Sequence, residues 1–247
     1  MGLRKEFLLV AAAATAIVIL VFVFGLPFRP LIGEVKAANC STDLSQSEII
    51  LPQPQYKGLS VEEAISKRRS VRDFGDQPLT KQELSQLLWA GQGITDPNGA
   101  RAAPSAGGLY PIELYVVPNR VEGIGCGIYH YVPQGHKLVL FKEGNFSDAV
   151  YRAGLSQNAL KDAAAVIVFS AVRERTAKKY GDTSDRFIAI EAGHISENIL
   201  LESVSLGLGA VPIGGFDQTG MDKAIGINGT GESAIYLNAI GKCVVLN

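Results

Sequence analysis

The sequence contains few of the residues that build metal centres. Its 247 residues include three cysteines and three histidines, and Cys40, Cys126 and Cys243 do not show the spacing of a metal-binding motif. No cluster of His, Cys and carboxylate residues has ligand spacing either. We therefore expect no metal site. The odd number of cysteines leaves one thiol unpaired, and the pattern allows a disulfide without indicating one.

The sequence also lacks an excess of charge and several catalytic motifs. Its formal net charge is −1, and removing the 4 cations and 2 carboxylates of residues 1–36 leaves 19 basic and 22 acidic residues, a net charge of −3. A nucleic-acid surface is therefore not expected. There is no GxSxG elbow, no P-loop lysine and no GxGxxG, which argues against a hydrolase triad and against both common nucleotide motifs.

One apolar segment near the N-terminus is long enough to cross a membrane. Residues 7–28 comprise 22 residues (28 − 7 + 1) and carry no charge. Because a helix rises about 1.5 Å per residue, roughly 20 apolar residues span a hydrocarbon core of about 30 Å. Arg4 and Lys5 precede the run, so the positive-inside bias keeps the short N-terminal end in the cytoplasm. We therefore expect one N-terminal transmembrane helix that anchors an extracytoplasmic domain.

Two alternatives to this topology stay open. Residues 1–28 could be a signal segment cleaved near residues 35–37, in which case the protein would be secreted. Arg29 and Lys36 follow the span, so the charge bias is slight and the orientation could be reversed. The anchor is preferred because the run is longer than a usual signal core and the candidate cleavage site lies well beyond its end.

The rest of the chain divides into a linker, residues 29–59, and one domain, residues 60–247. Prolines and the lack of an apolar period mark the linker. Capping boxes at residues 60–63 and 80–83 predict two helices, ending near residue 70 and at residue 91 or 93. Further helices are predicted at 147–155, 184–206 and 219–225, and strands at 112–117, 127–132, 137–141, 163–172, 210–213 and 234–240. Their irregular order favours an α+β fold over a doubly wound sheet.

A basic stretch follows the first predicted helix. Residues 67–72, Lys-Arg-Arg-Ser-Val-Arg, place four cations and a hydroxyl within six residues. Arginine offers a planar fork of donors that suits phosphate oxygens, so this stretch can bind a phosphate dianion. The alternative is a solvated basic turn that is favourable against the helix dipole.

Two glycine-rich stretches are candidates for contact with a flat ligand. Residues 103–111, Ala-Pro-Ser-Ala-Gly-Gly-Leu-Tyr-Pro, combine small residues with a hydroxyl and an aromatic ring. Residues 210–217 end a predicted strand in paired glycines, whose backbone N–H groups could face a flavin ring. The alternatives are an ordinary glycine-rich loop and a strand-to-helix turn.

Several other titratable residues are candidates for proton exchange or for hydrogen bonding. Lys178, Lys179 and Tyr180 follow a predicted buried strand and could exchange a proton with a substrate, although an exposed basic turn is the simpler interpretation. Glu191 could pair with an arginine such as Arg186. We expect the two histidines in or beside the predicted hairpin, at positions 130 and 136, to lie at the surface.

In order and character, these stretches resemble the nitroreductase superfamily, and most closely its SagB/ThcOx branch, which includes FMN-dependent azoline dehydrogenases. The resemblance covers residues 60–242. The residues that carry it are RRSVRDF (68–74), APSAGGLYPIELYVV (103–117), KYGDTSDRFIAIEAGH (179–194), GLGAVPIGGFD (207–217) and AIGK (239–242). It implies a nitroreductase-like α+β fold with a central, mostly antiparallel sheet flanked by helices, and a homodimer with FMN at its interface.

The resemblance also implies roles for individual residues. The phosphate and ribityl chain would be bound by Arg68, Arg69, Ser70 and Arg72. The terminal strand would reach the phosphate through Gly241 and Lys242. The loop beside the flavin, which the partner subunit contributes in dimeric members, corresponds to Pro104, Ser105, Ala106 and Gly107. The segment over the isoalloxazine ring corresponds to Pro212, Ile213, Gly214 and Gly215. The pair implicated in azoline oxidation, and so the expected catalytic pair, is Lys179 and Tyr180.

Two features depart from common family patterns. Residues 181–186 are more acidic than the Arg- and Tyr-rich run usual in the branch, and Gly214 stands where classical nitroreductases often carry a glutamate. The resemblance implies an FMN-dependent oxidoreductase that transfers hydride through flavin N5. Its donor would be NAD(P)H or a dihydro-heterocycle, and its substrate a small molecule or a modified peptide. The alternatives are a non-redox flavin-binding or flavin-consuming protein, and a membrane-anchored binding subunit on the same fold.

Overall fold

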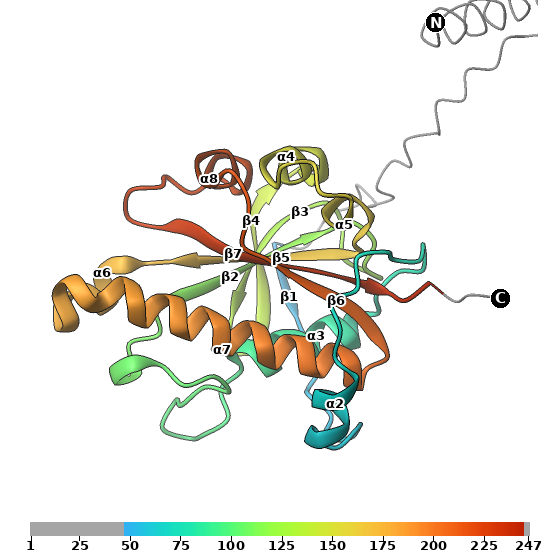
Figure 1. The fold of residues 1–247 in the computed structure, drawn as a ribbon, viewed down its shortest axis with the longest axis horizontal. Coiled ribbons are helices and arrows are strands. Elements are labelled where there is room, and N and C mark those ends of the chain that lie inside the picture. The colour runs from blue at the N-terminus through green and yellow to red at the C-terminus, as the bar shows by residue number, and fades with distance from the viewer. Residues whose placement is uncertain (1–46, 245–247) are drawn as a thin grey trace, which may run out of the picture. The chain divides into compact units, whose positions relative to one another are not determined.

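A computed structural model describes residues 47–244, and its centre is one antiparallel sheet of seven strands (Figure 1). The strand order is β1-β4-β3-β2-β5-β7-β6, and each neighbouring pair runs antiparallel. The strands are β1 (Glu48–Ile50), β2 (Ile112–Pro118), β3 (Gly127–Val132), β4 (Lys137–Glu143), β5 (Ala165–Ala171), β6 (Leu208–Ile213) and β7 (Ser233–Lys242). The predicted α+β fold with a central antiparallel sheet is thereby confirmed.

Helices cover both faces of the sheet (Figure 1). One face carries α4 (Ser147–Ala153), α5 (Asn158–Asp162) and α8 (Gln218–Ile225). The other carries α2 (Val61–Lys67), α3 (Lys81–Gln92), α6 (Arg173–Tyr180) and α7 (Ser184–Ser205). Short 3₁₀ turns lie at Ala106–Gly108 and Gly181–Thr183.

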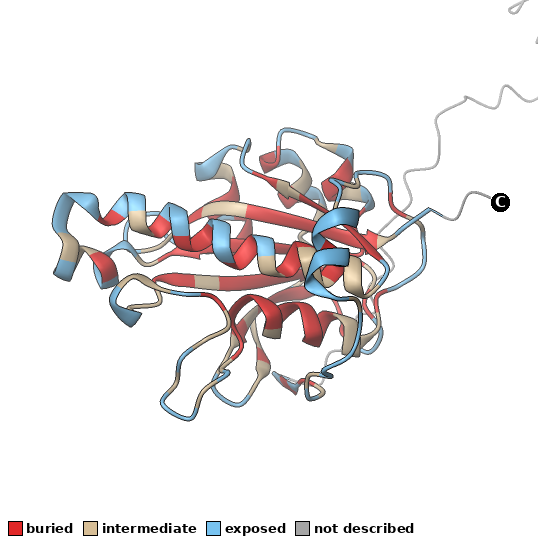
Figure 2. Ribbon diagram, turned by 60° about the horizontal axis from the view of Figure 1, so that its bottom comes forward, coloured by how far each residue is buried: buried red, intermediate tan, exposed pale blue. Residues whose placement is uncertain are grey.

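The interior strand β5 explains why two hydrophobic cores form. All of its residues are buried. Ile167 and Phe169 belong to the core under α3 and α7, whereas Val166 and Val168 belong to the core under α4, α5 and α8. A strand covered on both faces needs apolar side chains at every position, because successive side chains point to opposite faces. In Figure 2 the sheet is buried, while α7 shows exposed residues along its outer side.

Local signals placed the helix starts well. Both capping boxes are formed: the Ser60 and Thr80 side chains accept from the backbone N–H groups of Glu63 and Glu83, and each glutamate side chain accepts from its cap. Helix α3 ends at Gln92 with Gly93 as its C-cap, as the sequence predicted. Helix α2 ends at Lys67, about one turn earlier than predicted, and its exposed basic residues continue as an extended segment.

Three elements differ from the sequence-based expectation. Strand β1 forms within residues 29–59, the range interpreted as a linker, and it pairs with β4 at the sheet edge. Helix α5 was not predicted. Lys179 and Tyr180 were expected in a turn but lie in α6, whose only buried residue is Thr176. A helix this polar has no apolar period to reveal it.

The two hairpin histidines are also less exposed than expected. The His136 imidazole is half-buried and lies 2.7 Å from Ser85 Oγ and 2.8 Å from the Tyr131 hydroxyl. Burial lowers the pKa of His136. His130 Nε2 lies 2.7 Å from Glu113 Oε2. Polar neighbours on adjacent elements, which the sequence does not show, hold both rings in place.

The predicted transmembrane segment, residues 7–28, lies outside the described residues. Between residues 47 and 244, no helix combines the length and apolarity needed to span a membrane.

Candidate functional site

The basic segment after α2 lies along the edge of strands β6 and β7. The Val71 amide donates to Ala210 O at 3.0 Å, and Ser70 forms an isolated bridge with Ala210. Farther along, the Gly75 amide donates to Lys242 O at 2.8 Å. Residues 68–75 therefore follow the sheet edge, and the predicted phosphate-binding residues lie beside the start of β6.

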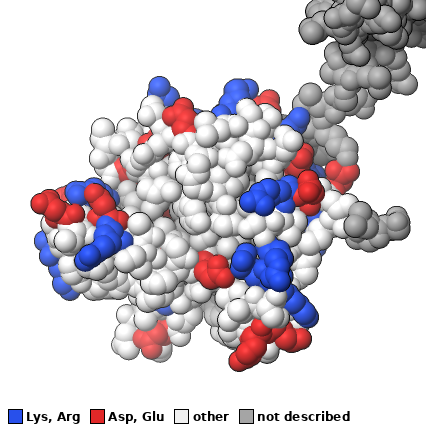
Figure 3. Space-filling view, in the orientation of Figure 1, with Lys and Arg blue, Asp and Glu red and all other residues white. Residues whose placement is uncertain are grey.

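The three arginines of this segment carry little compensating charge. Arg69 Nη1 donates only to the carbonyls of Ser66 and Arg68, at 3.1 and 2.6 Å. Arg72 Nη1 lies 3.4 Å from Ser70 O. Arg68 Nε lies 3.6 Å from the half-exposed carboxylate of Glu197 on α7. In Figure 3, basic side chains gather beside α2 along this segment. Exposed guanidinium groups without tight carboxylate partners suit phosphate binding.

The end of β7 is arranged differently from its predicted role. Lys242 Nζ lies 2.5 Å from Glu83 Oε1, and the two side chains are 26% and 16% exposed. The lysine charge is thus balanced within the chain. A Cβ atom at Gly241 would lie 2.9 Å from three atoms of the Phe74 side chain. Gly241 therefore allows the basic segment to pack on the sheet, which is a structural reason for glycine at this position.

Gly214, the first of the paired glycines after β6, borders a cavity of about 670 Å³. Its walls come from α7, from β7 and the loop before it, and from Gly214. A Cβ atom at Gly193 or Gly215 would meet no atom within 4 Å, and one at Gly214 would meet only the Tyr236 ring, at 3.5 Å. The backbone here is open to a flat ligand. Pro212 is half-buried and the side chain of Ile213 lies in the core.

The second glycine-rich stretch forms a loop tied to α7. Ser105 Oγ accepts from the Tyr110 amide at 2.8 Å and donates to Glu191 Oε2 at 2.5 Å. Pro104 is exposed and Ala106 half-buried. Gly107 has a φ of 66°, in the left-handed region that favours glycine. A Cβ atom there would lie 2.8 Å from Lys179 Nζ and 3.0 Å from the Tyr180 hydroxyl.

The structure thus brings the predicted catalytic pair to the glycine loop but not to the walls of the 670 Å³ cavity. Lys179 is exposed, with its Nζ 5.4 Å from the centroid of the Tyr180 ring. The Tyr180 ring packs against Phe187 with a centroid separation of 4.7 Å. Neither side chain lines the cavity.

Glu191 is the acid at the site whose pKa is shifted most. The residue is 2% exposed, and its Oε1 atom is buried without a hydrogen-bond partner among the described residues. Burial raises the pKa of Glu191 to about 7, although the Ser105 hydroxyl and the charge of Arg101 act in the opposite direction. The expected partner Arg186 instead lies over the Phe187 ring. Arg101 is the arginine that acts on this carboxyl.

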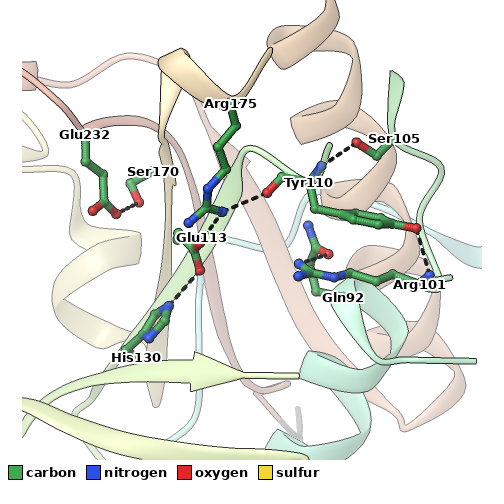
Figure 4. A network of polar contacts seen from close by, with 9 residues as sticks. All are labelled: Gln92, Arg101, Ser105, Tyr110, Glu113, His130, Ser170, Arg175 and Glu232. Carbon is green, nitrogen blue, oxygen red and sulfur yellow. Dashed lines mark hydrogen bonds and ion pairs between the residues drawn. The ribbon is translucent and has the colours of Figure 1, made fainter. Parts of the chain in front are cut away.

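A polar network on β2 and β5 was missed by sequence reasoning (Figure 4). Glu113 Oε1 lies 2.5 Å from Arg175 Nη1, and its Oε2 lies 2.7 Å from His130. Burial alone would raise the pKa of Glu113, but the hydrogen bonds and charges of His130 and Arg175 outweigh burial and lower it. On the neighbouring strand β5, Ser170 Oγ donates to Glu232 Oε1 at 2.5 Å. These residues belong to no short motif, so only the fold reveals the network.

Comparison with known proteins agrees with this architecture. A model of the nitroreductase family matches residues 65–242. A Methanocaldococcus jannaschii protein named as a nitroreductase is 39% identical over 189 residues, covering 76% of this chain and 94% of that protein. The trifolitoxin-processing protein TfxB of Rhizobium leguminosarum bv. trifolii is 33% identical over 122 residues, or 44% of this chain and 30% of that protein.

A solved structure extends the similarity to the fold. The crystal structure of a nitroreductase-type protein from Ralstonia eutropha JMP134 superposes with a TM-score of 0.72 at 28% identity, covering 84% of this chain and 94% of that chain. The match to the trifolitoxin-processing protein TfxB agrees with the branch that the sequence motifs indicated. On this evidence the chain belongs to the nitroreductase family, and within its superfamily it groups with the SagB-like branch.

Proposed function

We propose that this protein is an FMN-dependent oxidoreductase whose cofactor lies along β6 and α7. The observation that carries the proposal is a basic segment beside the start of β6 together with an open cavity next to Gly214, just beyond the end of β6. Membership of a family whose members are generally FMN-dependent oxidoreductases supports it.

The spacing along α7 fits an elongated ligand. Glu197, which lies beside Arg68, is eight residues from Ala189 in the cavity wall. Eight helical residues correspond to a rise of about 12 Å. Gly193 lies between them, and its missing side chain leaves open space at this point of α7. A phosphate at the arginines and a planar ring at the cavity would thus be joined by an extended chain along the helix.

The residues present fit FMN in kind as well as in position. Arg68, Arg69, Ser70 and Arg72 would hold the phosphate, because their donors face solvent without tight ion pairs. The backbone of Gly214 and Gly215 would lie against the ring and tune its electron affinity. When bound, FMN supplies the redox chemistry by accepting a hydride from one substrate and delivering it to another.

A homodimer would complete this site. The glycine loop at 104–107 is tied to its own α7 by Glu191 and exposes Pro104 and Gly107. In the proposed dimer, this loop would cover the ring bound by the partner subunit. Lys179 and Tyr180, which contact the loop, would then lie beside the reacting ring as proton acceptor and donor.

Two classes of electron donor remain within the proposal, NAD(P)H and a dihydro-heterocycle. The match to a trifolitoxin-processing protein favours a modified peptide as substrate. The match to a protein named as a nitroreductase favours a small-molecule substrate with NAD(P)H as electron donor.

Residues 7–28 would tether the domain to a membrane, with the domain on the outer side.

Retention of FMN after gel filtration tests the proposal. The full-length protein should retain about one FMN per chain, and Arg72→Ala should weaken FMN binding at least tenfold because a charged phosphate contact is lost. Lys178→Ala is the matched control, since Lys178 pairs only with exposed Glu174 on α6, and it should retain FMN normally. Failure to bind FMN, or equal loss in both variants, would refute the proposal.

The flavin-consuming alternative predicts a different outcome. If the protein degrades its flavin, FMN should disappear in proportion to turnover. An oxidoreductase should return its flavin unchanged through many cycles. Chromatographic quantification of FMN after turnover separates the two.

A further inference from the structure

Besides its glycines, the cavity next to Gly214 has a mostly apolar lining with few charges. Small and apolar side chains of α7 and β7 form much of the wall, including Ala189, Ala192, Ile188 and Ile235, together with the ring of Tyr236. Three charged residues also line it: Arg173, Asp185 and Glu232. Such a wall suits a flat ligand whose body is apolar and whose polar groups are few.

Two of the three charges neutralise each other. Arg173 Nε lies 2.5 Å from Asp185 Oδ1, and its Nη2 lies 3.3 Å from Asp185 Oδ2. The ion pair carries no net charge. The electrostatic character of the cavity therefore depends on Glu232.

Glu232 is held in place by the hydroxyl group of Ser170 (Figure 4). Fully buried Ser170 donates to Glu232 Oε1 at 2.5 Å. The charge of Glu232 also acts on Tyr115, whose pKa is raised by burial first and by this carboxyl second. In the part of the chain that the structure describes, no Lys or Arg nitrogen lies within ion-pair distance of it. The Glu232 carboxylate therefore has no ion-pair partner among the described residues.

Neighbouring groups make this end of the cavity more negative. Asp222 lies behind the same loop, where its Oδ1 accepts from the Ala234 amide at 2.7 Å. Burial raises the pKa of Asp222, and the nearby charges of Glu232 and Asp217 raise it further. Together these carboxylates favour a cation or an N–H donor and disfavour an anion.

We propose that Glu232 selects the substrate of this cavity, and that the substrate is a flat, largely apolar molecule carrying a cationic or N–H-bearing nitrogen at the Glu232 end. The inference rests on the proposed function in placing the substrate beside the flavin ring. Selection by Glu232 concerns substrate binding only and does not depend on the redox chemistry of the flavin.

The test compares benzamidine with benzamide, which share a shape but differ in charge. Calorimetric titrations of the FMN-loaded full-length protein should show roughly tenfold tighter binding of benzamidine, a ratio typical of one partly solvated charge contact. Glu232→Gln should abolish this preference, and Glu232→Asp should retain most of it. Glu174→Gln, which removes an exposed carboxylate outside the cavity, should leave it unchanged.

Each other outcome counts against the proposal. Equal binding of the two ligands, no binding of either, or a preference that survives in Glu232→Gln would overturn it. If the protein binds no FMN, the proposed function fails. The same titration on flavin-free protein then still tests Glu232, so the two failures are distinguishable.

Discussion

At the scale of single residues, burial decides how Glu191 behaves. The pKa of this carboxyl is about 7 in the folded protein, against about 4.5 when it is exposed. Below pH 4.5 the carboxyl is protonated in both the folded and the unfolded protein, so it does not lower the free energy of unfolding. Between these values only the unfolded chain ionises, so stability falls as pH rises and stays lowered above pH 7.

Glu191→Gln should remove this pH dependence. The free energy of unfolding of the wild type should drop relative to the variant between pH 4.5 and 7, by at most about 3 kcal/mol. Urea unfolding at intervals of half a pH unit measures the difference. Parallel pH profiles for the two proteins would show that Glu191 does not titrate near neutrality.

Two glycines separate the requirements of packing from those of binding. Gly241→Ala would place a Cβ atom 2.9 Å from the buried Phe74 side chain, and overpacking of this kind costs about 1–3 kcal/mol. Gly215→Ala meets no atom within 4 Å, so it should change stability by less than about 0.5 kcal/mol and should weaken FMN binding. Urea unfolding and FMN titration of both variants check this contrast, and a stable Gly241→Ala protein would contradict it.

The sequence revealed residues in local motifs better than residues that meet through the fold. The arginines proposed to bind phosphate were recognisable because all three lie within residues 68–72. Ser105 and Glu191 are 86 positions apart, so their hydrogen bond could not be anticipated. Glu232 was missed for the same reason, because its partner Ser170 is 62 positions away in the sequence.

At the scale of elements, capping determines how firmly α3 starts. The Thr80 side chain accepts from the Glu83 amide at 3.2 Å, and Glu83 also holds Lys242 at the end of β7. The N-terminus of α3 and the last strand are thereby joined. Helix α2 has a similar cap at Ser60, but six of its seven residues are exposed or half-exposed and only Ala64 is buried.

Thr80→Ala should therefore destabilise the protein by about 1 kcal/mol, the usual value of an N-cap. Ser60→Ala is the matched comparison and should cost less, because a short exposed helix can fray without disturbing the core. Thermal unfolding of both variants measures the difference. An equal or larger effect of Ser60→Ala would contradict the ranking.

Periodicity predicted the longer apolar elements and missed the elements that are short or highly polar. Strand β5 was evident from an unbroken apolar run, since both of its faces are covered. Helix α6 was not, because its charged sequence buries only Thr176. Strand β1 has three residues, too few for any alternation to appear.

At the scale of the whole molecule, the site depends on strand order. The basic segment, the glycines after β6 and the cavity wall on α7 come from residues 68–72, 193 and 214–215. Pairing with β6 places the basic segment at the start of that strand, and Gly214 follows its end. Neither composition nor periodicity encodes that order. Family resemblance predicted a central, mostly antiparallel sheet but not the order of its strands.

The central claim is that the protein binds FMN along β6 and α7 and uses it for redox chemistry. An anaerobic absorbance spectrum tests this claim most directly. Full-length protein incubated with FMN and freed of excess should show a bound-flavin spectrum. That spectrum should bleach when NADPH or a dihydro-heterocyclic substrate is added, and it should return in air. A protein that retains no flavin, or whose bound flavin stays oxidised with every donor of both classes, would contradict the account.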